Sequence, residues 1–358
     1  MRKVIVTTTI NPPTRAIEAF EAMEDWELVV IGDKKTPADY HLERGIYVTP
    51  EEQEKYDPAL SDAIGWNCIQ RRSFGLLWAK EMDADIVALV DDDNIPLPGW
   101  GEDLLVGKNV EVDFYETDLP AFDPVGATNH GHLWHRGYPI QLVPQRDYGR
   151  KARRTVRVDV QADFWNGDPD VDAVCRIEHA PECRFEAGQF PMAANRMGPF
   201  NSQNTFITRD VLGHYFLFPH VGRMDDIWGS YYVQALGFSV VYNRATVYQE
   251  RNAHDLVRDM RQEYLGYENN LKLVEDLARD PGRLLAYLPG RSAWAFHLYQ
   301  RHFDDAPQLH ALLSGAQTAE RARPDWGHPD EETARELIAS PVGSGDGSGS
   351  PVLVPRPR

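Results

Sequence analysis

Three consecutive aspartates, Asp91-Asp92-Asp93, are the residues of this sequence best suited to holding a metal ion. Adjacent carboxylates repel one another, so a cation or several hydrogen-bond donors must offset their charge. Hard oxygen ligands on a short turn suit Mg²⁺ or Mn²⁺, which keep several waters and bridge to substrate phosphates. We expect Asp91 and Asp93 to bind the metal. The alternative is a solvated loop, or a helix cap at Asp93.

Polar side chains earlier in the chain could bind a nucleotide beside this triplet. Asp33 could accept hydrogen bonds from a ribose or a base, although an isolated aspartate at such a position is more often a turn residue. Thr8, Thr9 and Asn11 add hydroxyl and amide groups. We expect these four residues to contribute to the nucleotide site together with Asp91 and Asp92.

An arginine pair and a second acidic pair complete the candidate residues. In Arg71-Arg72, Arg72 is predicted to point inward, where its guanidinium could bind diphosphate oxygens bidentately. Asp225 and Asp226 could act as general base, orient an acceptor hydroxyl or bind a sugar. The alternative is that Asp225 only caps the helix that begins there.

The pattern of elements indicates how these residues are brought together. Strand-like runs at 3–8, 27–31, 45–48 and 86–90 alternate with helical segments at 15–23 and 67–82. Such alternation predicts an α/β fold with a mostly parallel sheet, whose ligands bind beyond the carboxyl ends of the strands. Thr7 to Asn11, Asp33 and the triplet all sit at such ends, so they should share one crevice.

Regularity is weaker beyond the first hundred residues. Residues 101–198 are rich in Pro, Gly, Asp and aromatics, and we expect long functional loops there. Within them, the aspartates of 168–172 could instead form only a turn and a helix start. Regular elements resume with a strand at 204–208, a helix at 226–236 and a strand at 239–242. Residues 255–303 look helical, and the Gly/Ser/Pro-rich end from 340 is predicted to be disordered.

Composition excludes several classes of protein. The chain has 358 residues and a formal net charge of -18, which argues against broad contact with nucleic acid or anionic membrane. No apolar run approaches the roughly 20 residues of a membrane span and no signal peptide is evident, so we predict a cytoplasmic protein without an integral membrane segment. The three cysteines match no zinc signature, and the histidines form no HExxH motif.

Several longer motifs resemble the glycosyltransferase domain of STELLO proteins. They are TTTINPPT (7–14), VVIGDKKTP (29–37), VDDDN (90–94), NGDPDVDA (166–173), PFNSQNTF (199–206) and RMDDIWGSYY (223–232). They occur in the same order as in that family, and the resemblance covers about residues 4–251.

A fainter resemblance connects the chain to the reversibly glycosylated polypeptides, which act as UDP-arabinopyranose mutases. It rests on the acidic triplet, RGYP (136–139), the segment 225–228 and EYLG (263–266). In that family the arginine of RGYP is linked to reversible self-glycosylation, and Arg136 falls on it. The chain departs from the pattern at Val143, where a second arginine is expected, and at Gln249, where a histidine is expected.

Both resemblances imply a Rossmann-like glycosyltransferase A fold, a nucleotide diphosphate sugar (a UDP-sugar is the first candidate) and Mn²⁺ or Mg²⁺. The expected organisation is a nucleotide-sugar domain at 1–275, a helical C-terminal extension at 276–325 and a tail at 326–358. Asp225, Asp226 and Arg136 are the expected catalytic residues. The leading hypothesis is a glycosyltransferase acting on a carbohydrate or other acceptor. A pyranose/furanose mutase and a non-enzymatic sugar-binding protein are the alternatives.

Overall fold

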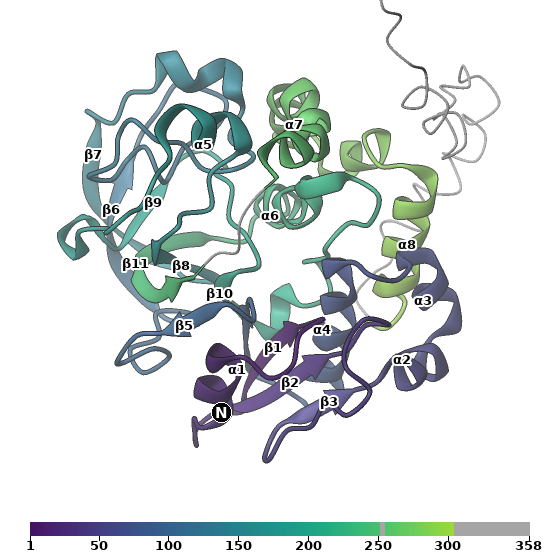
Figure 1. Ribbon diagram of the computed structural model, residues 1–358. Coiled ribbons are helices and arrows are strands. Elements are labelled where there is room, and N and C mark those ends of the chain that lie inside the picture. The colour runs from purple at the N-terminus through teal and green to yellow at the C-terminus, as the bar shows by residue number, and fades with distance from the viewer. Residues whose placement is uncertain (251–254, 304–358) are drawn as a thin grey trace, which may run out of the picture. The chain divides into compact units, whose positions relative to one another are not determined.

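The computed structural model describes residues 1–250 and 255–303 (Figure 1). The predicted tail at 326–358, and the part of the predicted extension beyond residue 303, lie outside the described residues. Within the described ranges, none of the helices combines the length and the apolarity that crossing a bilayer would require.

Strands and helices alternate through the first ninety residues, as predicted. The strands are β1 (Lys3–Thr8), β2 (Glu27–Ile31), β3 (Ile46–Val48), β4 (Ile86–Val90), β5 (Asn94–Pro96), β6 (Asn109–Tyr115), β7 (Lys151–Arg157), β8 (Val160–Gly167), β9 (Met192–Ala194), β10 (Asn204–Thr208) and β11 (Val240–Gln249). The α-helices are α1 (Arg15–Glu21), α2 (Pro50–Tyr56), α3 (Pro58–Ile64), α4 (Arg72–Glu81), α5 (Ala173–His179), α6 (Asp225–Ala235), α7 (Leu256–Leu277) and α8 (Gly290–Gln300). The 3₁₀ turns are η1 (Ile69–Arg71), η2 (Ile140–Gln145), η3 (Ala187–Gln189), η4 (Arg209–Val211), η5 (Gly222–Met224) and η6 (Pro281–Ala286).

All these strands belong to one sheet of order β3-β2-β1-β4-β10-β8-β11-β9-β6-β7, with β5 paired to β11. The four strands from β3 to β4 are mutually parallel. Beyond them the sheet is mixed, because β10 runs antiparallel to both β4 and β8, while β11 is parallel to β8. The predicted α/β class is confirmed.

The direction of β10 decides which loops meet. Since β10 is antiparallel to its neighbours, its first residue, Asn204, pairs with Val90 at the last position of β4. The carboxyl end of β8 lies at the same edge, because β8 runs parallel to β4. The loop after β4, the loop after β8 and the segment before β10 therefore converge, and Figure 1 shows this edge facing α6 and α7.

The parallel half of the sheet is covered by a closely packed helix. A Cβ placed on Gly75 of α4 would lie 2.2 Å from Cγ1 of Val6 in β1, so only glycine allows this approach. Val4, Ile5 and Val6 of β1 and every residue of β4 are buried. This burial on both faces explains the continuous apolar runs in the sequence.

The middle of the chain is more regular than predicted. Residues 101–198 contain β6, β7, β8, β9 and α5. The β6–β7 pair is stabilised by exposed ion pairs such as Lys151–Asp113 and Arg153–Glu111. β8 is buried although it contains Gln161 and Asp163, whose polar groups bond to one another at 2.8 Å. The charged residues of the β6–β7 pair and the polar residues of the buried strand β8 both interrupt the alternation of apolar and polar residues from which a strand is predicted.

The candidate site at the carboxyl edge of the sheet

An open cavity of about 580 Å³ lies at the edge where these loops converge. Its walls come from the segment before α4, the loops after β4 and β8, the segment between β6 and η2, the segment before β10, the turn leading into α6, and α7. The lining residues with polar or charged side chains include Gln70, Asp91, Arg136, Asp170, Ser202, Gln203, His220, Arg223, Asp225, Asp226 and Gln262. Four of the predicted site residues therefore share one cavity: Asp91, Arg136, Asp225 and Asp226.

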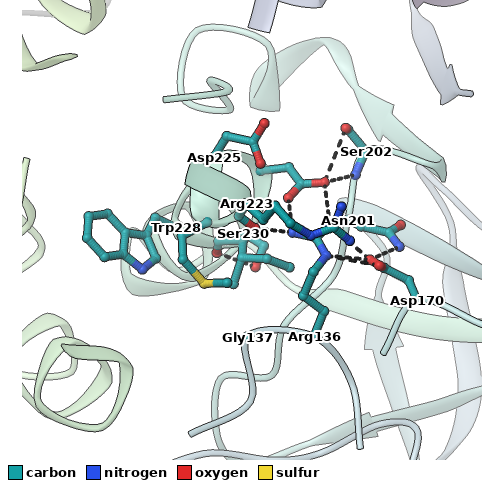
Figure 2. A network of polar contacts seen from close by, with 12 residues as sticks. Arg136, Gly137, Asp170, Asn201, Ser202, Arg223, Asp225, Trp228 and Ser230 are labelled. Atoms are coloured by element: carbon teal, nitrogen blue, oxygen red, sulfur yellow. Dashed lines mark hydrogen bonds and ion pairs between the residues drawn. The ribbon is translucent and has the colours of Figure 1, made fainter. Parts of the chain in front are cut away.

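Arg136 lies at the centre of a buried network of carboxylates (Figure 2). Its Nε donates to both oxygens of Asp170 at 2.9 and 3.1 Å, and its Nη2 donates to the same residue at 2.9 Å. On the other side, Nη1 and Nη2 donate to the two oxygens of Asp226 at 3.1 and 3.2 Å. Nη1 also donates to the backbone carbonyl of Arg223. Every nitrogen of the guanidinium is therefore engaged, and Arg136 is only 7% exposed.

The pKa values of the two aspartates at the start of α6 are shifted in opposite directions. Burial, and then the charge of Asp226, raise the pKa of Asp225 to about 7. Burial alone would also raise the pKa of Asp226, but the charge of Arg136 holds it below its usual range. Ser202 adds a backbone N–H bond to Asp226 at 2.9 Å, and Gln70 donates to Asp225 at 2.7 Å. Asp226 is therefore a fixed anion and Asp225 can exchange a proton near neutral pH.

Neither of these aspartates is the cap of α6. The cap position belongs to Met224, whose side chain makes no capping bond. The capping alternative for Asp225 is therefore wrong. Asp172, in contrast, caps α5 by accepting from the backbone N–H of Cys175 at 2.9 Å, as the helix-start alternative predicted.

Asp91 is the one member of the acidic triplet that lines the cavity. Its Oδ1 accepts from Nη2 of Arg72 at 2.5 Å, and Nη1 of Arg72 donates to the carbonyl and hydroxyl of Ser202 at 2.6 and 2.9 Å. Arg72 points inward as predicted and is 1% exposed, but it lies behind Asp91 rather than on the cavity surface.

The central aspartate of the triplet connects it to the first strand. Oδ2 of Asp92 accepts from the hydroxyl of Thr9 at 2.5 Å and from the amide of Asn11 at 3.0 Å. The hydroxyl of Thr14 donates to the backbone carbonyl of Asp92. Thr8 donates to the carbonyl of Ile31 at 2.8 Å, which ties β1 to β2. These residues hold the turn that presents Asp91, and they do not line the cavity.

Asp33 holds the part of the cavity wall formed by Asn67 and Cys68. It is 2% exposed and accepts backbone N–H bonds from Asn67 at 2.8 Å and Cys68 at 3.0 Å. Asn67 has a left-handed φ of 57°, a conformation that an external hydrogen bond helps to maintain. Next to it, Trp66 lies under the guanidinium of Arg71 at 3.6 Å. Arg71 is fully buried and bonds to Gln53 and Ser61.

Among residues 1–250 and 255–303, no group of three or more His, Cys, Asp or Glu side chains is placed to hold a metal by itself. Asp93 does not line the cavity, although its backbone carbonyl accepts from Glu250 at 3.3 Å. A cation held by Asp91, with or without Asp93, would thus need its remaining ligand oxygens from water and substrate, which is the usual arrangement for Mg²⁺ at phosphate sites.

The cavity residues that sequence reasoning did not select include Asp170, Gln70, Ser202 and Arg223. Asp170 could have been found, because it lies in the stretch 166–173 whose closely spaced aspartates were noted. Ser202 lies within the motif PFNSQNTF (199–206), whereas Gln70 carries no distinctive pattern. The contribution of Ser202 depends on β10 running antiparallel to β4, which places the segment before β10 beside the loop after β4.

Comparisons with known proteins confirm the STELLO resemblance. Two curated proteins of Arabidopsis thaliana, described as "Probable glycosyltransferase STELLO2" and "Probable glycosyltransferase STELLO1", are each 23% identical to this chain in an alignment of 278 residues that covers 67% of the chain. The chain spans about a third of their length, 35% and 34% respectively. No family model matches the chain.

Two solved structures align over most of the chain. Glucosyl-3-phosphoglycerate synthase from Mycobacterium tuberculosis is 14% identical, with 76% of this chain and 80% of that one covered and a TM-score of 0.42. A mannosyltransferase from Pyrobaculum calidifontis in complex with GDP-Man and Mn²⁺ is also 14% identical, covering 94% and 85%, with a TM-score of 0.36. By its sequence, then, this chain is similar to the STELLO glycosyltransferases over about two thirds of its length.

Proposed function

We propose that this protein is a glycosyltransferase that binds a nucleotide diphosphate sugar, with a UDP-sugar as the first candidate, and uses a divalent cation. The observation that carries the proposal is the cavity itself. It brings Asp91, at the end of a buried parallel strand, together with a fixed anion, Asp226, and a proton-exchanging acid, Asp225. The sequence similarity to STELLO glycosyltransferases supports the same activity.

The charge of the cavity supports the need for a cation. Asp91, Asp170, Asp225 and Asp226 line it together with the guanidinium groups of Arg136 and Arg223. Such an excess of carboxylates would repel a diphosphate unless a metal ion were bound between them. Asp91 offers the hard oxygen ligand that Mg²⁺ or Mn²⁺ prefers, and Asp93 is the second proposed ligand. When bound, the cation would offset the negative charge that develops on the leaving diphosphate.

The other residues support this site in distinct ways. We propose that Asp225 accepts the proton of an acceptor hydroxyl, because an acid with a pKa near the working pH is best suited to that task. Arg136 and Asp226 keep Asp225 in position and set its charge environment. Arg72 orients Asp91, and Asp33 holds the loop at 67–68 against which a nucleoside would lie. The turn that presents Asp91 to the sugar donor is stabilised by Thr8, Thr9, Asn11 and Asp92.

A nucleotide-sugar mutase is the second candidate function, and the fainter resemblance in the sequence is its support. The geometry of Arg136 does not favour self-glycosylation there, because all three of its nitrogens already donate to carboxylates or a carbonyl. The acidic cavity is equally compatible with a third candidate, a nucleotide-sugar binding protein without catalysis.

One experiment separates these candidates. The full chain is screened by thermal shift against UDP-, GDP- and ADP-sugars with and without Mn²⁺, because a ligand of the native state raises the melting temperature. The donor that binds is then incubated with the protein, first alone and then with candidate acceptors. Transfer to an acceptor supports our proposal. A new ring isomer formed without acceptor indicates the mutase, and binding with neither product indicates the non-enzymatic protein.

A further inference from the structure

The turn that leads into α6 carries a second arginine that lines the cavity, Arg223. The side chain of Arg223 is 23% exposed. Its Nε donates to Oε1 of Glu263 in α7 at 2.8 Å. Nη1 forms a longer ion pair with Oδ1 of Asp259, at 3.8 Å, which is beyond hydrogen-bond distance. Among the described residues, neither terminal nitrogen of Arg223 has a hydrogen-bond acceptor.

The backbone fixes where this arginine lies. His220 and Gly222 both have left-handed φ values, 65° and 61°. A Cβ on Gly222 would lie 2.1 Å from the carbonyl oxygen of Gln262, so the turn packs directly on α7 and requires glycine. The carbonyl of Arg223 also accepts from Nη1 of Arg136. The position of Arg223 is thus set from two sides, as expected of a residue that contacts a ligand.

Glu263 determines which edge of the Arg223 guanidinium faces the cavity. It is fully buried, and its Oε2 accepts from the backbone N–H of Ala173 at 2.8 Å and from the hydroxyl of Tyr267 at 2.7 Å. Because Glu263 is held by α5 and α7 in this way, it binds Nε of Arg223 and leaves the Nη1/Nη2 edge to the cavity. That edge presents parallel N–H donors suited to two oxygens of one phosphate.

We infer that Arg223 is the residue through which the cavity binds a phosphate group of its substrate, and that Glu263 positions it. The other arginine on the cavity surface, Arg136, already uses every nitrogen. This inference rests on the proposed function. The phosphate would belong either to the diphosphate of the sugar donor or to an anionic group of the acceptor. In either case the contact is a charge-assisted bond, which is worth about tenfold or more in affinity.

The test measures binding to the full chain by titration calorimetry, with inorganic pyrophosphate and UDP, each with Mg²⁺, and with inorganic phosphate added to UDP-saturated protein. The variants are Arg223→Gln and Arg223→Lys. The matched control is Arg244→Gln, because Arg244 is 49% exposed, lies 3.9 Å from Asp103 and does not line the cavity. We expect at least a tenfold weakening in Arg223→Gln, a smaller one in Arg223→Lys, and none in the control.

The probes separate the two sources of phosphate. Weaker pyrophosphate and UDP binding assigns Arg223 to the donor diphosphate. Unchanged UDP binding with weaker inorganic phosphate binding assigns it to the acceptor. If Arg223→Gln, with a wild-type melting temperature, binds all three probes as the wild type does, the inference is wrong. If the wild-type protein binds pyrophosphate but no nucleotide sugar, the proposed function is wrong. The pyrophosphate affinities of the wild type and of Arg223→Gln would then still test the inference about Arg223.

Glu263→Gln tests the positioning role. Its amide cannot accept both the Ala173 N–H and the Tyr267 hydroxyl while also accepting from Arg223, so the guanidinium loses its fixed orientation. We expect a weakening of pyrophosphate binding smaller than that of Arg223→Gln. The double variant should bind no more weakly than Arg223→Gln alone, because Glu263 acts through Arg223. Additive losses would show that Glu263 acts independently and would refute the positioning role.

Discussion

Nη1 of Arg136 and Oδ1 of Asp226 lie 3.1 Å apart, and both side chains are less than one-tenth exposed. The same guanidinium bonds to Asp170, so one buried cation serves two buried anions. Buried ions cost several kcal/mol each to desolvate, and removing one partner of such a group leaves an uncompensated charge. This arrangement holds together the loop after β8 and the start of α6, which form two walls of the cavity.

Arg136→Lys should therefore be strongly destabilising although it preserves the charge. A lysine ammonium cannot donate in parallel to Asp170 and Asp226, so one carboxylate loses its partner. We expect the free energy of unfolding in urea to fall by about 3 kcal/mol. Arg153→Lys is the control, because Arg153 is exposed and pairs with Glu111 and Asp113 on the sheet edge, where the change should be under about 1 kcal/mol. Equal effects of the two substitutions would contradict a central role for Arg136.

The pH dependence of transfer should report on Asp225. Because its pKa is raised to about 7 and its ionised form is the proton acceptor, kcat/KM should rise as the pH increases through about 7 and then level off. Asp225→Asn should lower kcat by about 10²- to 10⁴-fold, with donor affinity unchanged by calorimetry. A variant that keeps the same pH profile and rate would exclude Asp225 as the base.

Asp33→Ala tests whether this carboxylate acts by holding the cavity wall. The substitution leaves the backbone N–H groups of Asn67 and Cys68 without their acceptor, and we expect a loss of stability of about 1–3 kcal/mol. Nucleotide binding should weaken as well, because the wall at 66–68 loses its anchor. Hydrogen exchange of the Asn67 and Cys68 amides is the direct measurement. If nucleotide affinity falls while both amides stay protected, Asp33 contacts the ligand itself, as the sequence alone predicted.

The sequence predicted those elements whose residues follow one clear physical pattern. β4 is apolar at all five positions because both of its faces are buried, and α6 begins at the acidic pair as expected to within one residue. The direction of β10 has no such signal. A βαβ pattern implies parallel neighbours, yet β10 pairs antiparallel with β4 and so brings Ser202 to Arg72 and Asp91. The triplet was therefore recognisable, whereas the network around Arg136 was not.

Strand β8 was missed for a related reason, and its buried acid leads to the last prediction. Asp163 accepts from Gln161 at 2.8 Å, Asn243 at 2.9 Å and Thr246 at 2.8 Å, where β11 shifts register between Asn243 and Val247. Burial outweighs these bonds and raises the pKa of Asp163 to about 6. In the unfolded chain the group should titrate near its ordinary value of about 3.9.

Since the folded pKa exceeds the unfolded one, the stability linked to this proton is fully present below about pH 4 and is lost as the pH rises through about 6. Compared with Asp163→Asn, which does not titrate, the wild type should lose about 2 kcal/mol of unfolding free energy between pH 4 and pH 7. Urea unfolding of both proteins across this range measures the difference. Parallel stability curves for the two proteins would mean that Asp163 has an ordinary pKa in the folded state, and that the network at the β11 register shift fully compensates its burial.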